Sequence, residues 1–200
     1  MTLTELDYSG DVTGRTPRRR MPDGDEYIPP HPDVPAPPSI CFNGLHPTLR
    51  AFQGQNWKVP MVFADVETTG LSPDQDRIVE IGGVRYDGEG NYEGSFHCYT
   101  DPGIPIPDEA AAIHGISDSK MREMLDNGQA VPLSRSVMRS FARFCRGAVF
   151  VAHNGTVFDR LFIDRECNRH RIPTITDEVG GLDTLHMARM RWPGCRVSLD

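Results

Sequence analysis

The sequence predicts an α/β fold, a mixed sheet in which three antiparallel strands are followed by parallel β-α units, with helices on both faces. Two observations lead to this prediction. Apolar, β-prone runs come early and are joined by short turns, which is typical of antiparallel hairpins. Later in the chain, an apolar run lies between two segments of helical periodicity, and this alternation is typical of parallel strands.

The folded domain is expected to begin near residue 59 of the 200 residues. Residues 1–58 hold nine of the seventeen prolines, and a chain of that composition buries too little apolar surface to offset its conformational entropy. We therefore interpret 1–58 as a largely disordered extension and 59–200 as the domain. Apolar residues return in 40–58, so this part has the composition to pack on the domain.

The first three strands follow one another closely. The first is the apolar run Val59–Val66, which ends before the turn residue Gly70, and the next two cover 78–86 and 95–100. Between the last two, residues 87–91 (Asp-Gly-Glu-Gly-Asn) form a turn short enough for a hairpin. The three strands should therefore pair antiparallel.

The later elements are indicated by periodicity and by helix start and stop signals. They are a short helix over 108–113 that ends at Gly115, a second short helix capped by Ser117, an amphipathic helix over 137–145, an apolar strand over 148–152, a helix over about 158–169, and a short strand over 182–185 before another helix. In the 158–169 helix, Leu161 and Phe162 are expected on the inner side.

Composition narrows the class of protein. No apolar run has the length of a membrane span, and the N-terminal segment carries acidic groups where a signal peptide needs an apolar core. Five scattered cysteines without a Cys-x-x-Cys pair argue against a disulfide framework and a thiolate zinc site. The sequence therefore predicts a cytoplasmic protein with no membrane partner.

The net charge of −7 is distributed unevenly along the chain. Residues 59–134 carry 4 basic and 14 acidic residues, whereas 135–200 carry 11 basic and 7 acidic residues. An acidic pocket that gains divalent ions accepts phosphate, and a neighbouring arginine-rich surface suits a nucleic-acid backbone. The alternative is that these arginines are solvated helix faces.

Asp65 and Glu67 are the first candidate site residues. They lie two apart on a strand, so their carboxylates point to the same side and repel each other unless a cation joins them. Oxygen ligands of this kind suit Mg²⁺ or Mn²⁺, and carboxylates that hold a pair of metal ions occur in many enzymes that hydrolyse phosphodiesters. The alternative is a pair of acidic side chains that face water.

Asp159 is the third candidate. It follows His153-Asn154-Gly155, where the 148–152 strand gives way to a helix, and open α/β sheets place their sites at such junctions. One turn into the helix, its carboxylate is in a position to face the end of the first strand. The alternative is an acidic residue that only complements the helix dipole.

Four motifs occur in one order: Asp-Val-Glu-Thr-Thr-Gly at 65–70, Ile-His-Gly-Ile at 113–116, His-Asn-x-x-x-Phe-Asp at 153–159, and Asp-Thr-Leu at 183–185. In this combination, the chain from about Val59 to Asp200 resembles the DEDDh 3′–5′ exonucleases. Among them it resembles the proofreading epsilon subunits of bacterial replicative DNA polymerases. The closing segment 192–200 looks like the start of the family's next helix.

The resemblance implies a ribonuclease H-like fold and hydrolysis of the terminal phosphodiester with two Mg²⁺ or Mn²⁺ ions, which releases nucleoside 5′-monophosphates. It implies that Asp65, Glu67 and Asp159 are catalytic metal ligands. Substrate-binding roles are implied for Thr68, Thr69, Leu71, His114 and Asn154, and roles in supporting the site or the fold for His153, Phe158 and Asp183. The implied partners are DNA 3′ ends, single-stranded or mismatched, and a DNA polymerase.

The family's third motif does not occur in these 200 residues: a general-base histidine followed five residues later by the fourth metal-binding aspartate. Two explanations remain open. Either the domain lacks a C-terminal part that follows Asp200 in a longer enzyme, which we favour, or a complete protein keeps the fold and binds ends without efficient catalysis. The alternatives to a DNA exonuclease are therefore an RNA-trimming exonuclease and a nucleic-acid-binding or polymerase-docking module.

Overall fold

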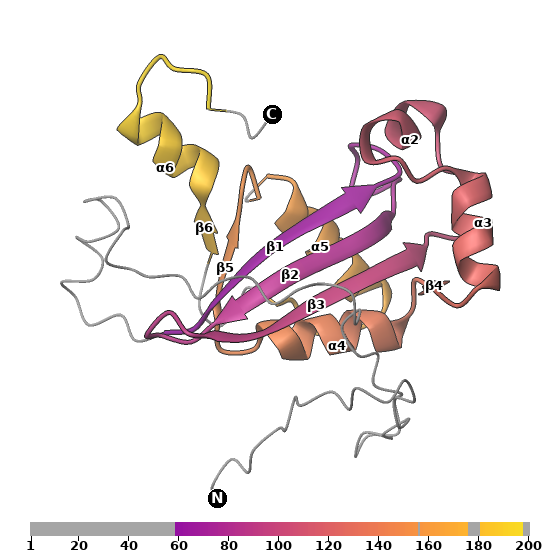
Figure 1. Ribbon diagram of the computed structural model, residues 1–200, viewed down its shortest axis with the longest axis horizontal. Coiled ribbons are helices and arrows are strands. Elements are labelled where there is room, and N and C mark those ends of the chain that lie inside the picture. The colour runs from indigo at the N-terminus through magenta and orange to yellow at the C-terminus, as the bar shows by residue number, and fades with distance from the viewer. Residues whose placement is uncertain (1–58, 156, 176–180, 198–200) are drawn as a thin grey trace, which may run out of the picture.

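The computed structural model describes residues 59–155, 157–175 and 181–197 (Figure 1). The predicted extension 1–58 lies outside the described residues. The described strands form one sheet in the order β4-β3-β2-β1-β5-β6. They are β1 (Met61–Thr68), β2 (Ile78–Tyr86), β3 (Tyr92–Asp101), β4 (Ala130–Pro132), β5 (Val149–Ala152) and β6 (Gly181–Asp183). The helices are α2 (Asp108–His114), α3 (Asp118–Asp126), α4 (Arg135–Cys145), α5 (Asp159–Arg169) and α6 (Thr184–Arg191).

The sheet is mixed, as the sequence predicts. β2 pairs antiparallel with both β1 and β3, whereas β5 runs parallel to β1 and β6 runs parallel to β5. The sequence does not predict β4, which pairs parallel with β3. It has only 3 residues, too few to show an alternating pattern.

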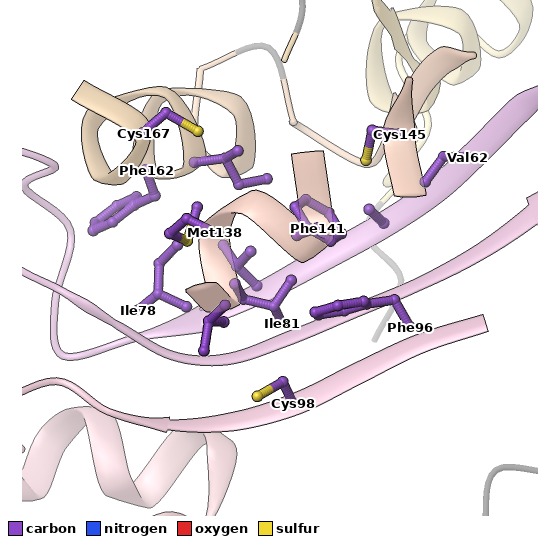
Figure 2. Close-up of a cluster of buried hydrophobic side chains, with 14 of the residues drawn as sticks. Val62, Ile78, Ile81, Phe96, Cys98, Met138, Phe141, Cys145, Phe162 and Cys167 are labelled. Atoms are coloured by element: carbon purple, nitrogen blue, oxygen red, sulfur yellow. The ribbon is translucent and has the colours of Figure 1, made fainter. Parts of the chain in front are cut away.

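One face of the sheet is covered by α4 and α5, which enclose the main hydrophobic core (Figure 2). Side chains alternate between the two faces of a strand, so three alternating positions of β1 point into this core. The sheet contributes Val62, Ala64, Val66, Ile78, Ile81, Phe96 and Cys98, and the two helices contribute Val137, Met138, Phe141, Cys145, Phe162, Ile163 and Cys167. The opposite face of β1 is therefore left for its other side chains, among them Asp65 and Glu67.

The sequence assigns Leu161 wrongly. We expected Leu161 and Phe162 on the inner side of α5, but Leu161 is 46% exposed and Phe162 is fully buried. Asp159, Phe162, Ile163 and Glu166 are the buried residues at i, i+3, i+4 and i+7 of this helix. They define its inner face, and Leu161 lies beside that face.

A second, smaller core holds α2 and α3 at the end of the sheet near the carboxyl end of β1 (Figure 1). It consists of Val79, Ile106, Ile116, Met121, Met124 and Ala130. The predicted helix signals are present: Gly115 ends α2 with a φ of 74°, and the Ser117 hydroxyl accepts a hydrogen bond from the Lys120 amide at 3.3 Å. This core fixes the position of His114, the last residue of α2.

The boundary between β6 and α6 differs from the prediction. A strand is expected over 182–185, but β6 ends at Asp183 and α6 begins at Thr184. The Asp183 carboxylate accepts hydrogen bonds from the amides of Leu185 and His186, so it caps the helix and ends the strand. No helix in the described part of the chain is long and apolar enough to cross a membrane.

The two neighbouring residues on α5 give a test of the core. We expect Phe162→Ala to lower the free energy of unfolding by about 3–5 kcal/mol, because it opens a cavity in the main core. Leu161→Ala, the matched control, should change it by about 0.5 kcal/mol or less. Urea unfolding of both variants measures the difference. Equal losses would contradict the burial of Phe162 and the exposure of Leu161.

Candidate active site

The candidate site begins with Asp65 and Glu67 on the face of β1 that points away from the main core. Ala64 and Val66, their neighbours in sequence, are buried in that core, so the two carboxylates share the other face. The register of β1 with β2 is regular through Glu67 and shifts between Glu67 and Thr68. The shift lies where β1 leads into the loop at 69–77, and such irregularities re-aim side chains at a strand end.

Asp159 reaches the same place from α5. Its carboxylate accepts a hydrogen bond from the Val66 amide at 3.0 Å, although 93 residues separate the two in sequence. The chain turns sharply between β5 and α5, and a Cβ at Gly155 would overlap the side chain of Ala152. Only glycine permits this close approach, which brings the first residue of α5 to β1. Asp159 is consequently only 2% exposed.

The carboxyl groups of Asp65 and Asp159 lie close enough for each to shift the pKa of the other. Burial, followed by the charge of Asp65, raises the pKa of Asp159 to about 7. Burial also raises the pKa of Asp65, and the hydrogen bond from Asp159 partly opposes that shift. Burial and then the charge of Asp65 raise the pKa of Glu67. The site therefore holds more negative charge than it can stabilise alone.

A fourth acidic residue, Glu80 on β2, belongs to this surface and is missed by our sequence interpretation. It lies directly opposite Glu67 in the strand register, and its charge contributes to the raised pKa values of Asp65 and Glu67. Its carboxylate lies 2.6 Å from Nε2 of His97 on β3. The available signal was an acidic residue in the middle of the apolar run that forms β2.

The proposed substrate-contacting residues that follow β1 differ in exposure. Thr68 and Thr69 are buried, and their hydroxyl groups hydrogen-bond within the loop, to the Gly70 carbonyl at 2.6 Å and the Asp76 carboxylate at 3.2 Å. Leu71 is 83% exposed. The loop thus exposes the apolar Leu71 side chain a few residues after Glu67 and uses its threonine hydroxyls to hold its own shape.

The remaining candidates lie on the segments around the carboxylates. Nδ1 of His114 accepts a hydrogen bond from the Ile116 amide at 3.1 Å, and burial lowers the pKa of this histidine. The ring of Phe158 packs on Phe162 at a centroid distance of 5.0 Å. Phe158 therefore has a packing contact that supports the start of α5.

His153, Asn154 and Asp183 connect the β5–α5 turn with α6. Nδ1 of His153 lies 3.0 Å from the Thr184 hydroxyl, and the charge of His153 acts on Asp65 to lower its pKa. The backbone amide of Asn154 donates a hydrogen bond to the Asp183 carboxylate at 3.0 Å. Asp183 therefore joins the β5–α5 turn to the capped start of α6. Asn154 itself is exposed and has a φ of 60°.

The donor chemistry fits a divalent cation. Among the described residues, no group of three or more His, Cys, Asp and Glu is arranged as it stands to hold a metal ion. Burial and the charge of Asp65 nevertheless raise the pKa of Asp159, an unfavourable balance that a bound cation would relieve, and carboxylate oxygens are the preferred ligands of Mg²⁺ and Mn²⁺. Glu67 supplies a further carboxylate on the same face.

The fold and the paired carboxylates at a strand end define an α/β domain of the nuclease class. A model of the exonuclease family matches residues 62–198, and the chain belongs to this family. The resemblance to the DEDDh exonucleases, drawn from the four motifs, is thereby confirmed.

The chain is similar to components of bacterial DNA polymerase III. It is 38% identical over 132 residues to a PolC-type DNA polymerase III of Streptococcus thermophilus, and the aligned residues make up 66% of this chain and 8% of that protein. It is 34% identical over 142 residues to the DNA polymerase III subunit epsilon of Rickettsia typhi, which covers 70% of this chain and 58% of that protein. The chain thus spans less than two thirds of either relative.

Among solved structures, the fold is similar to that of Escherichia coli exonuclease I in complex with a dT13 oligonucleotide. The TM-score is 0.58 at 19% identity, with 66% of this chain and 29% of that chain covered. This likeness confirms the ribonuclease H-like fold expected from the motifs.

The raised pKa of Asp159 predicts how stability depends on pH without metal. Between the usual aspartate pKa, about 4, and the folded-state value of about 7, the folded protein holds a proton that the unfolded chain has released. Stability should therefore fall as the pH rises through this window, and Mg²⁺ should reduce the fall. Urea unfolding across pH 4–8, with a chelator and with Mg²⁺, measures how the free energy of unfolding changes with pH.

Asp159→Asn should flatten this pH dependence, because the asparagine has no proton to lose. Asp126→Asn, at the exposed end of α3, is the control and should keep the wild-type slope. An unchanged slope in Asp159→Asn would refute the assignment of the titration to the Asp65–Asp159 pair.

Proposed function

We propose that this domain is a metal-dependent 3′–5′ exonuclease of the proofreading type, which hydrolyses the terminal phosphodiester of DNA. The observation that carries the proposal is the approach of Asp159 on α5 to Asp65 on β1, fixed by the 3.0 Å hydrogen bond from the Val66 amide to the Asp159 carboxylate, in a member of the exonuclease family. Two carboxylates held close together repel each other, and a divalent cation between them would gain the attraction of both.

Asp65, Glu67 and Asp159 would hold two Mg²⁺ or Mn²⁺ ions. When bound, such ions lower the pKa of an attacking water and neutralise charge on the phosphate in the transition state. The Val66 amide keeps one Asp159 oxygen in place through the 3.0 Å hydrogen bond, so the carboxylate is oriented before metal arrives. Burial of Asp159 limits competing water around that oxygen.

The terminal nucleotide would lie beside the loop that follows β1. Leu71 offers an exposed apolar side chain against the last base, and the backbone near Thr68 and Thr69 would approach the 3′ hydroxyl. His114 ends α2 and Asn154 follows β5, and both residues would contact the DNA strand.

DNA is the proposed substrate because the relatives are components of DNA polymerase III and the similar solved structure holds a dT13 oligonucleotide. The same relatives make a DNA polymerase the proposed partner. None of these comparisons supports the RNA-trimming alternative.

We expect Mg²⁺-dependent shortening of a 5′-labelled single-stranded DNA from its 3′ end, and a loss of at least about 100-fold in Asp65→Ala, since loss of groups that only support metal ligands already costs ~10–100-fold. Gel analysis of the products, with and without a chelator, measures it. Glu89→Ala, in the turn at the opposite end of the sheet, is the matched control and should retain wild-type activity.

Three results would count against this proposal. Binding of 3′ ends without shortening would favour the binding or docking module. Faster shortening of RNA of the same sequence would contradict the choice of DNA. Activity retained in Asp65→Ala would contradict the assigned site.

A further inference from the structure

A cluster of charged residues on α5, at the opposite end of that helix from Asp159, holds the loop at 69–77. Glu166 lies two helical turns after Asp159 on the same face of α5, and its carboxylate is fully buried. Nε and Nη2 of Arg77 donate to the two Glu166 oxygens at 2.6 and 3.1 Å. Nη1 of Arg169 donates to Oε1 of Glu166 at 2.7 Å. Glu166 thus fixes two guanidinium groups.

Arg169 also donates to the backbone of the loop. Nη1 donates to the Asp76 carbonyl at 3.2 Å, and Nη2 donates to the carbonyls of Pro73 and Asp74 at 2.9 and 2.7 Å. Three carbonyls of a tight turn therefore converge on one planar group. The ammonium group of a lysine has no such fork and would not replace it.

The loop passes this restraint on to Leu71. The Asp76 carboxylate accepts from the Ser72 amide at 2.9 Å and from the Thr69 hydroxyl at 3.2 Å. These two residues flank the segment that contains Leu71, so Asp76 brackets that segment on both sides. Arg169 donates a hydrogen bond to the backbone carbonyl of Asp76, and Arg169 and Asp159 both lie on α5.

We propose that Arg169 is a positioning residue that sets the place of Leu71 relative to the Asp65–Asp159 carboxylates, and thereby the fit of the terminal nucleotide. The inference rests on the function proposed above. Leu71 is largely exposed and makes no packing contact in the main core, so the loop backbone has to determine where it lies. Leu71 is assigned to the terminal base and not to the reacting atoms, so a displaced Leu71 weakens the binding of the terminal nucleotide more than it slows the chemical step.

The test compares Arg169→Met and Arg169→Lys with Arg165→Met in the full chain. Lysine keeps the charge next to Glu166 and lacks the fork, so both Arg169 variants should show the same defect. Arg165 contacts the same loop through an ion pair with the Asp74 side chain, and both side chains are well exposed. Arg165→Met should therefore behave as wild type.

The first readout is hydrogen exchange of the loop amides. Both Arg169 variants should speed exchange at Thr69, Gln75 and Asp76, whose amides donate to backbone carbonyls within the loop, and leave exchange in β1 unchanged. Wild-type exchange in Arg169→Lys would overturn the proposal, because charge alone would then suffice. Equal acceleration in Arg165→Met would overturn it as well.

The second readout is the Michaelis analysis of oligonucleotide shortening. Loss of positioning should raise KM by roughly 10-fold and change kcat less, whereas simple loss of folded protein lowers the apparent kcat at constant KM. An unchanged KM in both Arg169 variants would overturn the proposal.

If the wild-type chain binds 3′ ends without cutting them, the catalytic part of the proposed function fails and the affinity for a labelled strand in Ca²⁺ replaces KM. The affinity should then fall by roughly 10-fold in both Arg169 variants, and an unchanged affinity would overturn the inference. If the wild-type chain does not bind 3′ ends either, the proposed function fails as a whole, and the proposed effect of Arg169 on substrate fails with it. Hydrogen exchange of the loop amides still decides whether Arg169 holds the loop.

Discussion

The proposed chemistry depends on the closeness of the Asp65 and Asp159 carboxyl groups, which the hydrogen bond from the Val66 amide to Asp159 secures. Two carboxylates separate in water, and only a structure that fixes both backbones keeps them together. β1 supplies one from a strand with a buried face, and α5 supplies the other from its first residue. The Val66 amide joins the two elements at 3.0 Å. A cation bound by the two carboxylates would recover the energetic cost of that proximity, which is how a fold preorganises a metal site.

The sequence predicts most of the fold because its signals are local. β2 is predicted with its observed bounds, Ser117 caps its helix as expected, and Asp65, Glu67 and Asp159 stand out as acids at strand and helix ends. The signals fail where tertiary contacts decide. β4 exists only because it pairs with β3, and Leu161 lies outside the inner face that Phe162 and its neighbours define.

The interactions of Glu80 and Glu166 are the part of the site that sequence reasoning cannot supply. Glu80 faces Glu67 across the strand pair and lies beside His97, a contact fixed by strand register. Glu166 binds Arg77, 89 residues away in sequence, and looks in the sequence like any acidic residue on a helix surface. Long-range ion pairs leave no periodic signal, so the charge run that contains Glu166 gave no sign of its burial.

Ion pairs on α5 change the role that we assign to the arginines of residues 135–200. The surplus of arginines there suggested a surface for a nucleic-acid backbone, yet all three arginines on α5 have acidic partners. Arg160 pairs with Asp164, Arg165 with Asp74, and Arg169 with Glu166. Of the three, Arg169 holds the loop backbone, and the charge of each arginine is partly offset by its acidic partner. Under the proposed function, metal ions held by the carboxylates would compensate phosphate charge at the candidate site, because the acidic face of β1 and β2 would otherwise repel a DNA strand.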